Sequence, residues 1–190
     1  MKIRSFLAFD IPEDVKKVLA KVVDDFSKKE KGVNWIPTEN MHVTMKFFGE
    51  INEDLLLGEI SDAVEQVTKK FEPIVLDCSG VGVFPDWKYP KVIWAGFIGE
   101  IDKVLDFQKM IEVNLKKFPI KKDERAFRLH LTMGRTKATK IQSGLMKLIE
   151  KLGPITFGEV KIDHLTLYKS VLTKSGAVYT PVKSFVLGEG

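Results

Sequence analysis

The stretch that decides the fold runs Arg128-Leu129-His130-Leu131-Thr132-Met133-Gly134-Arg135 and collects side chains suited to an anion. Its central tripeptide, His130-Leu131-Thr132, has a counterpart 88 residues earlier in His42-Val43-Thr44. Side chains alternate between the two faces of a strand, so each His shares a face with its Thr, about 7 Å away. An imidazole beside a hydroxyl suits proton transfer next to a phosphate. Two such strands facing each other would form a symmetric clamp.

The same alternation sorts the neighbouring residues. In the first copy it directs three residues to the core, Val43, Met45 and Phe47, and four to the open face, His42, Thr44, Lys46 and Phe48. In the second copy the inward residues are Leu129, Leu131 and Met133, and those opposite are Arg128, His130 and Thr132. Phe48 is therefore the aromatic residue expected to stack on a base beside the phosphate, with core packing as its alternative role. Three further aromatics are weaker candidates for stacking: Trp35, Trp94 and Tyr168.

Hydrophobic periodicity around both copies predicts the same order of elements: strand, helix, His-x-Thr strand, helix, strand. The predicted helices cover about 13–29, 52–70, 101–118 and 138–152. We therefore expect an α+β protein with a single domain over residues 1–190, built as a pseudo-twofold duplication of two interlocked lobes. The approximate repeats are 1–85 and 91–170, and a C-terminal hairpin completes the chain to residue 190.

Composition limits the class of protein. The chain has 190 residues, of which 44% are hydrophobic, as in a globular domain with a sizeable core. No apolar run approaches the roughly 18 residues of a membrane-spanning helix, and the first residues predict a strand rather than a signal peptide, so we expect a cytoplasmic protein without a membrane partner. A single cysteine, Cys78, excludes an internal disulfide framework, and three histidines leave little for a structural zinc site. We expect no metal, and a monomer without an obligate protein partner.

Positive charge is concentrated in one segment. Residues 116–140 hold nine basic side chains against two acidic ones, in a chain whose net charge is only +4. Arg125, Arg128 and Arg135 surround His130, and the planar guanidinium group suits bidentate binding of an anion. A polyanion such as RNA is the partner that this segment favours. The alternative is a solvated, lysine-rich face without a ligand.

The third histidine also lies in a His-x-Thr pattern, His164-Leu165-Thr166. It has no counterpart in the other half, and the apolar phase of the sequence switches at this point, as at a bulge or a change of sheet face. We expect His164 to be a structural residue, hydrogen-bonded near a sheet edge. The tripeptide alone is a weak signal, so the hypothesis of catalysis depends on the pairing of His42 with His130.

Several motifs together are specific for one family. They are Arg4-Ser5-Phe6-Leu7-Ala8-Phe9, the run from Trp35 to Glu50, Gly80-Val81-Gly82-Val83-Phe84-Pro85, Val92-Ile93-Trp94-Ala95-Gly96, the stretch from His130 to Arg135, and a tail with Ser170-Val171-Leu172, Gly176 and Tyr179. With these motifs the chain resembles the two-histidine (2H) phosphoesterase superfamily, and within it the RNA 2',3'-cyclic phosphodiesterases, also called 2'-5' RNA ligases. Met45 and Met133 stand where the family usually has Leu, a change of similar volume. The resemblance implies two antiparallel sheets flanking a central cleft, with helices on the outside and the paired motifs facing each other.

The resemblance also implies the chemistry. It places catalysis at His42 and His130 and phosphate binding at Thr44, Thr132 and Arg135. His42 would give a proton to the leaving 3'-oxygen and His130 would take one from water, which leaves a 2'-phosphate, although the residues by themselves do not say which His is the acid. No cofactor or metal is required, and run backward the same groups would join a cyclic end to a 5'-hydroxyl without ATP. Alternation alone points Arg135 to the apolar side, so its role also depends on the strand ending at Gly134.

The expected substrate is RNA with a 2',3'-cyclic phosphate end, tRNA fragments included. Two alternatives stay open. One is a non-catalytic module that binds RNA ends through the same cleft and the basic segment. The other keeps the chemistry but acts on 2'-5' oligonucleotides or small cyclic phosphates. Turnover measured across a panel of such compounds separates the three.

Overall fold

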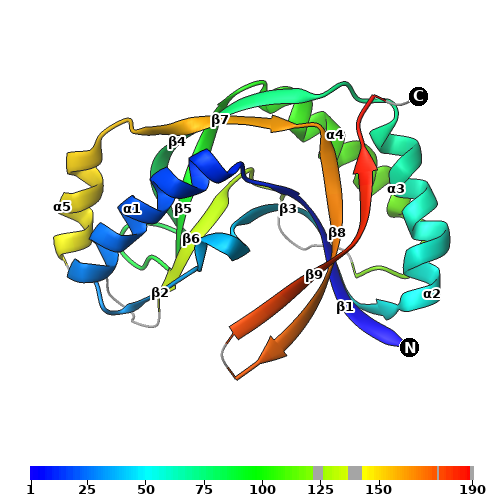
Figure 1. Ribbon diagram of the computed structural model, residues 1–190, viewed down its shortest axis with the longest axis horizontal. Coiled ribbons are helices and arrows are strands. Elements are labelled where there is room, and N and C mark those ends of the chain that lie inside the picture. The colour runs from blue at the N-terminus through cyan, green and yellow to red at the C-terminus, as the bar shows by residue number, and fades with distance from the viewer. Residues whose placement is uncertain (122–125, 137–142, 175, 189–190) are drawn as a thin grey trace.

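The computed structural model describes residues 1–121, 126–136, 143–174 and 176–188, and its strands form two antiparallel sheets (Figure 1). The first sheet has four strands, in the order β3 (His42–Asn52), β1 (Lys2–Asp10), β8 (His164–Thr173) and β9 (Gly176–Val186). The second has five, in the order β2 (Val33–Trp35), β6 (Leu131–Thr136), β5 (Val92–Gly99), β4 (Ile74–Phe84) and β7 (Thr156–Ile162). One His-x-Thr motif therefore begins β3 in the first sheet, and the other leads into β6 in the second.

Helices lie on the outside of the sheets, at both ends of the molecule (Figure 1). They are α1 (Glu13–Lys29), α2 (Glu53–Leu55), the π-helical turn Leu56–Ile60, α3 (Ser61–Thr68), α4 (Ile101–Leu115) and α5 (Ser143–Leu152), with a 3-10 turn at Thr38–Asn40. The α+β fold with two antiparallel sheets and outer helices is confirmed. Of the helix predicted over 138–152, the part before Ser143 lies outside the described residues.

The two halves of the chain interlock by exchanging elements. β4 comes from the first half yet pairs with β5 and β7, and β8 comes from the second half yet pairs with β1 and β9. Likewise α1, which follows β1 of the first sheet, packs against β7 of the second. The switch of apolar phase near residue 163 marks the place where the chain leaves β7 and enters β8 in the other sheet. The repeat boundaries 1–85 and 91–170 stay a prediction.

One continuous hydrophobic core joins the two sheets. Phe9 of β1 meets Phe97 of β5 edge-on, with ring centroids 6.2 Å apart, and both side chains are buried. The apolar stripes of α1 and α4 cover this core, with Leu19 and Phe107 fully buried. Because burial of each such side chain contributes roughly 1.5–3 kcal/mol, this packing fixes the position of one sheet relative to the other.

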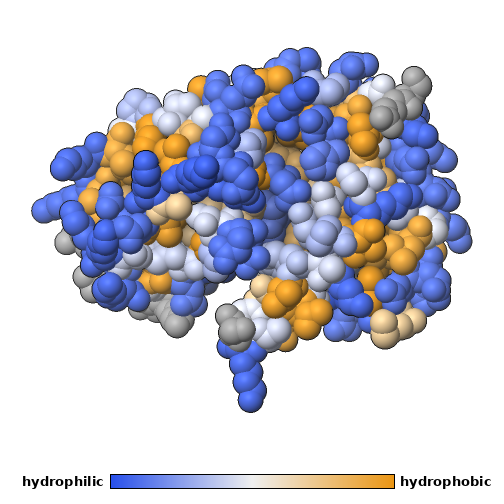
Figure 2. All heavy atoms as spheres, viewed as in Figure 1, coloured by the Kyte–Doolittle hydropathy of each residue, from blue (hydrophilic) through white to orange (hydrophobic). Residues whose placement is uncertain are grey.

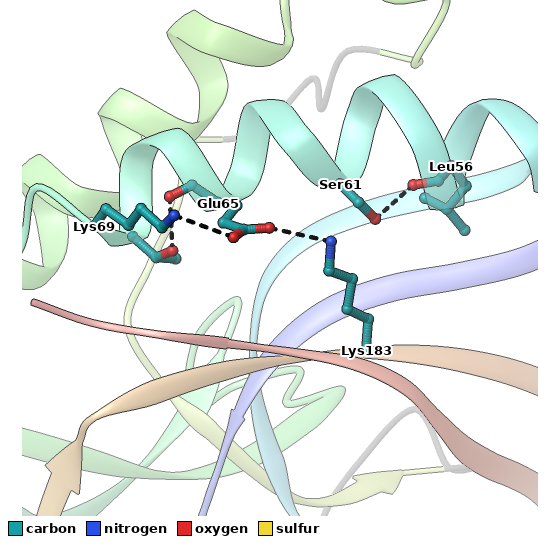
Figure 3. Close-up of polar contacts among 6 residues, drawn as sticks. Leu56, Ser61, Glu65, Lys69 and Lys183 are labelled. Carbon is teal, nitrogen blue, oxygen red and sulfur yellow. Dashed lines mark hydrogen bonds and ion pairs between the residues drawn. The ribbon is translucent and has the colours of Figure 1, made fainter. Parts of the chain in front are cut away.

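Polar contacts on α3 attach this helix to the first sheet (Figure 3). Lys183 of β9 places Nζ 3.2 Å from Glu65 Oε2, and Lys69 places its Nζ 3.3 Å from Glu65 Oε1. The Ser61 hydroxyl donates to the Leu56 carbonyl at 2.7 Å and so connects α3 to the π-helical turn. Exposed ion pairs contribute at most about 1 kcal/mol each, so the buried face of the helix supplies most of its attachment.

Candidate active site

A cavity of about 470 Å³ lies between the two sheets. Its walls include five of the six predicted site residues: His42, Thr44, His130, Thr132 and Arg135. The other lining residues are Arg4, Phe6, Ile36, Asn40, Phe47, Ser170, Leu172, Ala177 and Tyr179. The two His-x-Thr motifs, one from each sheet, therefore face a single space. The catalytic and binding roles of these residues stay predictions.

Each of the two histidines is held by the backbone carbonyl two residues before it. His42 Nδ1 lies 2.8 Å from the carbonyl oxygen of Asn40, and His130 Nδ1 lies 2.6 Å from that of Arg128. A carbonyl oxygen can only accept, so Nδ1 carries the hydrogen in both contacts. Nε2 is then the nitrogen left to exchange a proton in both rings.

Aromatic rings pack against both imidazoles. Phe6 stacks on His42 with centroids 4.6 Å apart and an interplanar angle of 22°, and Tyr179 meets the same ring edge-on at 5.2 Å. His130 has one such neighbour, Phe84, at 5.1 Å and 78°. These contacts restrict the orientation of the two imidazoles and partly remove them from water.

His42 lies beside a carboxylate. Burial lowers the pKa of His42 below its ordinary value, and Lys16 acts in the same direction, whereas the Asn40 carbonyl and the Asp10 carboxylate favour the protonated ring and oppose the shift. Asp10 is the cross-strand partner of His42. Two hydroxyl groups donate to the Asp10 carboxylate, that of Tyr168 at 2.7 Å and that of Thr166 at 3.2 Å. This anchored negative charge favours the protonated form of His42 and partly offsets the effect of burial on its pKa.

His130 lies among cations instead. Burial lowers its pKa too, the Arg128 carbonyl opposes that shift, and the guanidinium groups of Arg135 and Arg128 lower the pKa further. Arg128 also lies over the Phe84 ring, with Cζ 5.2 Å from the centroid. Burial and both guanidinium groups therefore all favour the neutral imidazole of His130.

The prediction for Phe48 is wrong, because a β-bulge follows the first motif. The register of β3 against β1 slips by one residue at Met45, which reverses the alternation as far as Phe48, where a second slip occurs. Phe48 is 4% exposed and packs in the core, whereas Phe47 is 37% exposed and lines the cavity. Lys46, also expected on the open face, is buried. Arg4 lies over the Phe47 ring, with Cζ 5.1 Å from the centroid.

A matching slip follows the second motif and explains Arg135. The register of β6 against β5 shifts by one residue at Met133, and the strand continues past Gly134 instead of ending there. The slip turns Arg135 towards the cavity. An added Cβ at Gly134 would lie 2.7 Å from Val33 Cγ1, so the bare backbone leaves room for β2. Phe47 and Arg135 thus hold equivalent positions, each three residues after the Thr of its motif.

Sequence reasoning did not assign the other nine residues of the cavity wall to a site; Arg4, Phe6, Asn40 and Tyr179 are among them. Part of the signal was present, because alternation puts Arg4 and Phe6 on one face of the first strand. Their membership of the site follows only from the pairing of β1 with β3, which local patterns do not contain.

The remaining predicted features lie elsewhere. His164 is not part of the cavity wall; its Nδ1 lies 2.6 Å from Asp163 Oδ1, and it lies outside the part of β8, Thr166 to Lys169, that pairs with β1. Four cations of the basic segment lie outside the described residues: Lys122, Arg125, Lys137 and Lys140. Within the described residues, no three His, Cys, Asp or Glu side chains are grouped to hold a metal ion. In the same part of the chain, no helix has the length and apolar character needed to cross a membrane.

Comparison with known proteins connects this cavity to a family. The LigT-like phosphoesterase model matches residues 9–94 and 99–179, and each range includes one of the paired motifs. A curated RNA 2',3'-cyclic phosphodiesterase of Methanocaldococcus jannaschii is 36% identical over 96% of this chain and 99% of its own length. One from Methanothermobacter thermautotrophicus is 31% identical over 98% of this chain and 100% of its own.

Solved structures share the two-sheet architecture. The protein TT0787 of Thermus thermophilus matches with a TM-score of 0.81 at 24% identity, over 98% of both chains. Escherichia coli LigT, solved in complex with 3'-AMP, matches with a TM-score of 0.71 at 19% identity, over 98% of this chain and 99% of its own. These likenesses support the fold of the whole chain.

Proposed function

Because the chain belongs to the LigT-like phosphoesterase family, we propose that it is a cyclic phosphodiesterase that hydrolyses 2',3'-cyclic phosphate ends of RNA to 2'-phosphomonoesters. The observation that carries the proposal is the meeting of two His-x-Thr motifs in one cavity, with both histidines anchored through Nδ1. Such a pair can act as acid and base on opposite sides of one phosphorus atom. The curated relatives' shared name supports RNA as the substrate.

The proposed reaction is an in-line displacement at phosphorus. The water oxygen bonds to phosphorus while His130 takes a proton from that water. The bond between phosphorus and the 3'-oxygen breaks, and His42 gives its proton to this oxygen. The product is a 2'-phosphomonoester with a free 3'-hydroxyl. Exchange with solvent then returns both imidazoles to their starting forms, since histidine titrates near neutral pH.

Three side chains would stabilise the charge on the phosphate. Thr44 and Thr132 can each donate a hydroxyl hydrogen to a non-bridging oxygen, and Arg135 can donate two parallel hydrogen bonds. Negative charge is spread over these oxygens in the transition state of phosphoryl transfer, so donors aimed at them lower the barrier. All three side chains line the cavity together with the histidines.

Phe47 is the stacking surface that we propose for the terminal base. Its ring is partly exposed in the cavity wall and lies nearly parallel to Phe6, at 6.0 Å and 8°. Arg4 lies on the Phe47 ring and would fix its position through a cation–π contact. Stacking on an aromatic ring tolerates every base, which suits an enzyme that recognises an end rather than a sequence.

The reverse reaction uses the same groups. A 5'-hydroxyl in place of water would attack the cyclic phosphate, with His130 as base and His42 as acid, and the new bond would be a 2'-5' linkage. The energy is stored in the strained cyclic ester, so no ATP is consumed. Fragments of tRNA with cyclic phosphate ends are among the substrates that we propose for both directions of the reaction.

Separate His42→Ala and His130→Ala variants test the proposal. Loss of a general acid or base should lower kcat by a factor of about 10²–10⁴ on nucleoside 2',3'-cyclic phosphates, with unchanged thermal unfolding. Phosphorus NMR should identify the wild-type product as the 2'-phosphate. His164→Ala is the matched control and should keep activity. Full activity in either cavity variant would refute the mechanism. Turnover only on 2'-5' linked oligonucleotides would change the substrate, and RNA binding without turnover would make the protein a binding module.

A further inference from the structure

The two ribbons of the first sheet separate beside the cavity. The β1–β8 ladder ends at the pair of Ser5 with Lys169. Beyond this pair β1 stays bonded to β3, and β8 stays bonded to β9 in a long hairpin. Figure 1 shows the blue end of β1 and the orange and red hairpin pointing away from each other. A wedge-shaped gap between two strand edges results.

This gap is a second hollow that continues from the first. It measures about 340 Å³, and Arg4, Ser170 and Leu172 line both cavities. In the space-filling view, the hairpin projects beyond the rest of the outline of the molecule (Figure 2). The two hollows therefore adjoin along these three side chains.

The lining of the second hollow is cationic. It contains Lys2, Arg4 and Lys169 against one carboxylate, Glu50. Ile3 turns into the core, so Lys2 and Arg4 share the open face of β1 about 7 Å apart. Among the residues that the structure describes, neither Lys2 nor Lys169 forms an ion pair. These two lysines, one on each edge of the gap, suit the repeating negative charge of a phosphodiester chain.

The occupant follows from the chemistry of the substrate end. A 2',3'-cyclic phosphate closes the 3' end of an RNA, so the rest of the chain can continue only from the 5' side of the terminal nucleotide. We propose that the hollow lined by Lys2, Arg4 and Lys169 binds the phosphates of these preceding nucleotides. The inference rests on the proposed function. It makes the preferred substrate an RNA chain rather than a mononucleotide.

The same lining predicts whether the hollow discriminates among RNA bases. The hollow has no aromatic side chain in its wall, and its apolar members include Leu172, which is 69% exposed. Without a stacking ring, the groove contacts backbone charge and leaves the preceding bases free. The groove therefore adds no preference for the identity of the preceding bases.

A binding assay tests the groove separately from catalysis. The probe is a fluorescein-labelled RNA tetranucleotide ending in a 2'-phosphate, and the reference ligand is a nucleoside 2'-phosphate. Replacing Lys2 and Lys169 together by Ala should weaken tetranucleotide binding by about 5- to 30-fold more than mononucleotide binding. The slope of log Kd against log salt for the tetranucleotide should fall by about 1.4, since each phosphate contact on a single strand accounts for roughly 0.7.

Two matched variants complete the experiment. Lys151→Ala combined with Lys161→Ala removes the same charge from exposed positions on α5 and β7 and should leave the slope unchanged. Glu50→Gln should tighten tetranucleotide binding by about two- to fivefold, because it removes the one repelling carboxylate. Equal behaviour of the two double variants, or equal losses for both ligands, would overturn the inference. Absence of turnover in the wild type with salt-sensitive tetranucleotide binding intact would instead count against the proposed reaction alone.

Discussion

Phe47 and Phe48 should respond to truncation in opposite ways, because the β-bulge at Met45 gives them different environments. Phe48 is 4% exposed, and Phe→Ala in a packed core costs about 3–5 kcal/mol. For a chain of 190 residues, 1 kcal/mol shifts Tm by roughly 2–4 °C, so Phe48→Ala should lower Tm by about 6–20 °C. Phe47 is 37% exposed, and its truncation should lower Tm by only a few degrees, with the loss of the Arg4 contact worth about 0.5–1 kcal/mol.

Activity should show the reverse order. A base stacked on an aromatic ring gains about 1–3 kcal/mol, so Phe47→Ala should raise KM for a nucleoside 2',3'-cyclic phosphate by about 5- to 140-fold. Phe48→Ala should keep its KM at temperatures where it stays folded. Circular dichroism melts give Tm for both variants, and steady-state kinetics give KM for both. A raised KM in Phe48→Ala together with a normal KM in Phe47→Ala would refute the bulge and restore simple alternation along β3.

Three further changes probe the charges and packing of the site. Asp10→Asn removes the carboxylate that favours protonated His42, so the pKa of His42 should fall further. Because His42 is the proposed acid, activity should be lost as pH rises through its pKa, and in the variant the alkaline limb of the kcat/KM profile should move to lower pH; an unmoved limb would contradict the assignment. Arg135→Lys keeps the charge but loses the bidentate fork, and kcat/KM should drop by about 10- to 150-fold, whereas retention of activity would mean that charge alone suffices. Gly134→Ala places a Cβ 2.7 Å from Val33 Cγ1 and should destabilise the protein by about 1–3 kcal/mol. The measurement is Tm, which should fall; an unchanged Tm would show that β2 can move away from the added methyl group.

The sequence was informative where local periodicity decides the structure. The strand Lys2–Asp10 and the pairing of each His with its Thr followed from alternation, because period two holds without interruption up to Thr44 and Thr132. The duplication into two repeats stays a prediction, based on the recurrence of the same element order. Alternation failed one residue beyond each Thr, where pairing with the neighbouring strand produces a bulge. The bulged residues are methionines rather than glycines, so the sequence gives no sign of a bulge there.

The pairing of strands with one another was the other feature that local sequence patterns could not predict. β4 and β8 are predicted as strands from the sequence, but the sheet that each of them joins is decided by pairing with strands far away in the chain. For this reason the second hollow was not foreseen, since it exists only where β8 stops pairing with β1. Arg4 could be placed on a strand face from alternation, but not in a site.

The two bulges give the two sides of the cleft different side chains. Each bulge presents the residue three positions after its Thr, which is Phe47 on the first sheet and Arg135 on the second. In the proposed binding mode, the base lies on the first sheet and the guanidinium group of the second sheet holds the phosphate oxygens. The proposed division of acid and base follows from the charges alone, with a carboxylate beside His42 and guanidinium groups beside His130. Moving the aromatic residue to the other sheet, in a Phe47→Arg, Arg135→Phe double variant, should therefore abolish hydrolysis rather than reverse the roles, because the charges around the two histidines would no longer match the substrate.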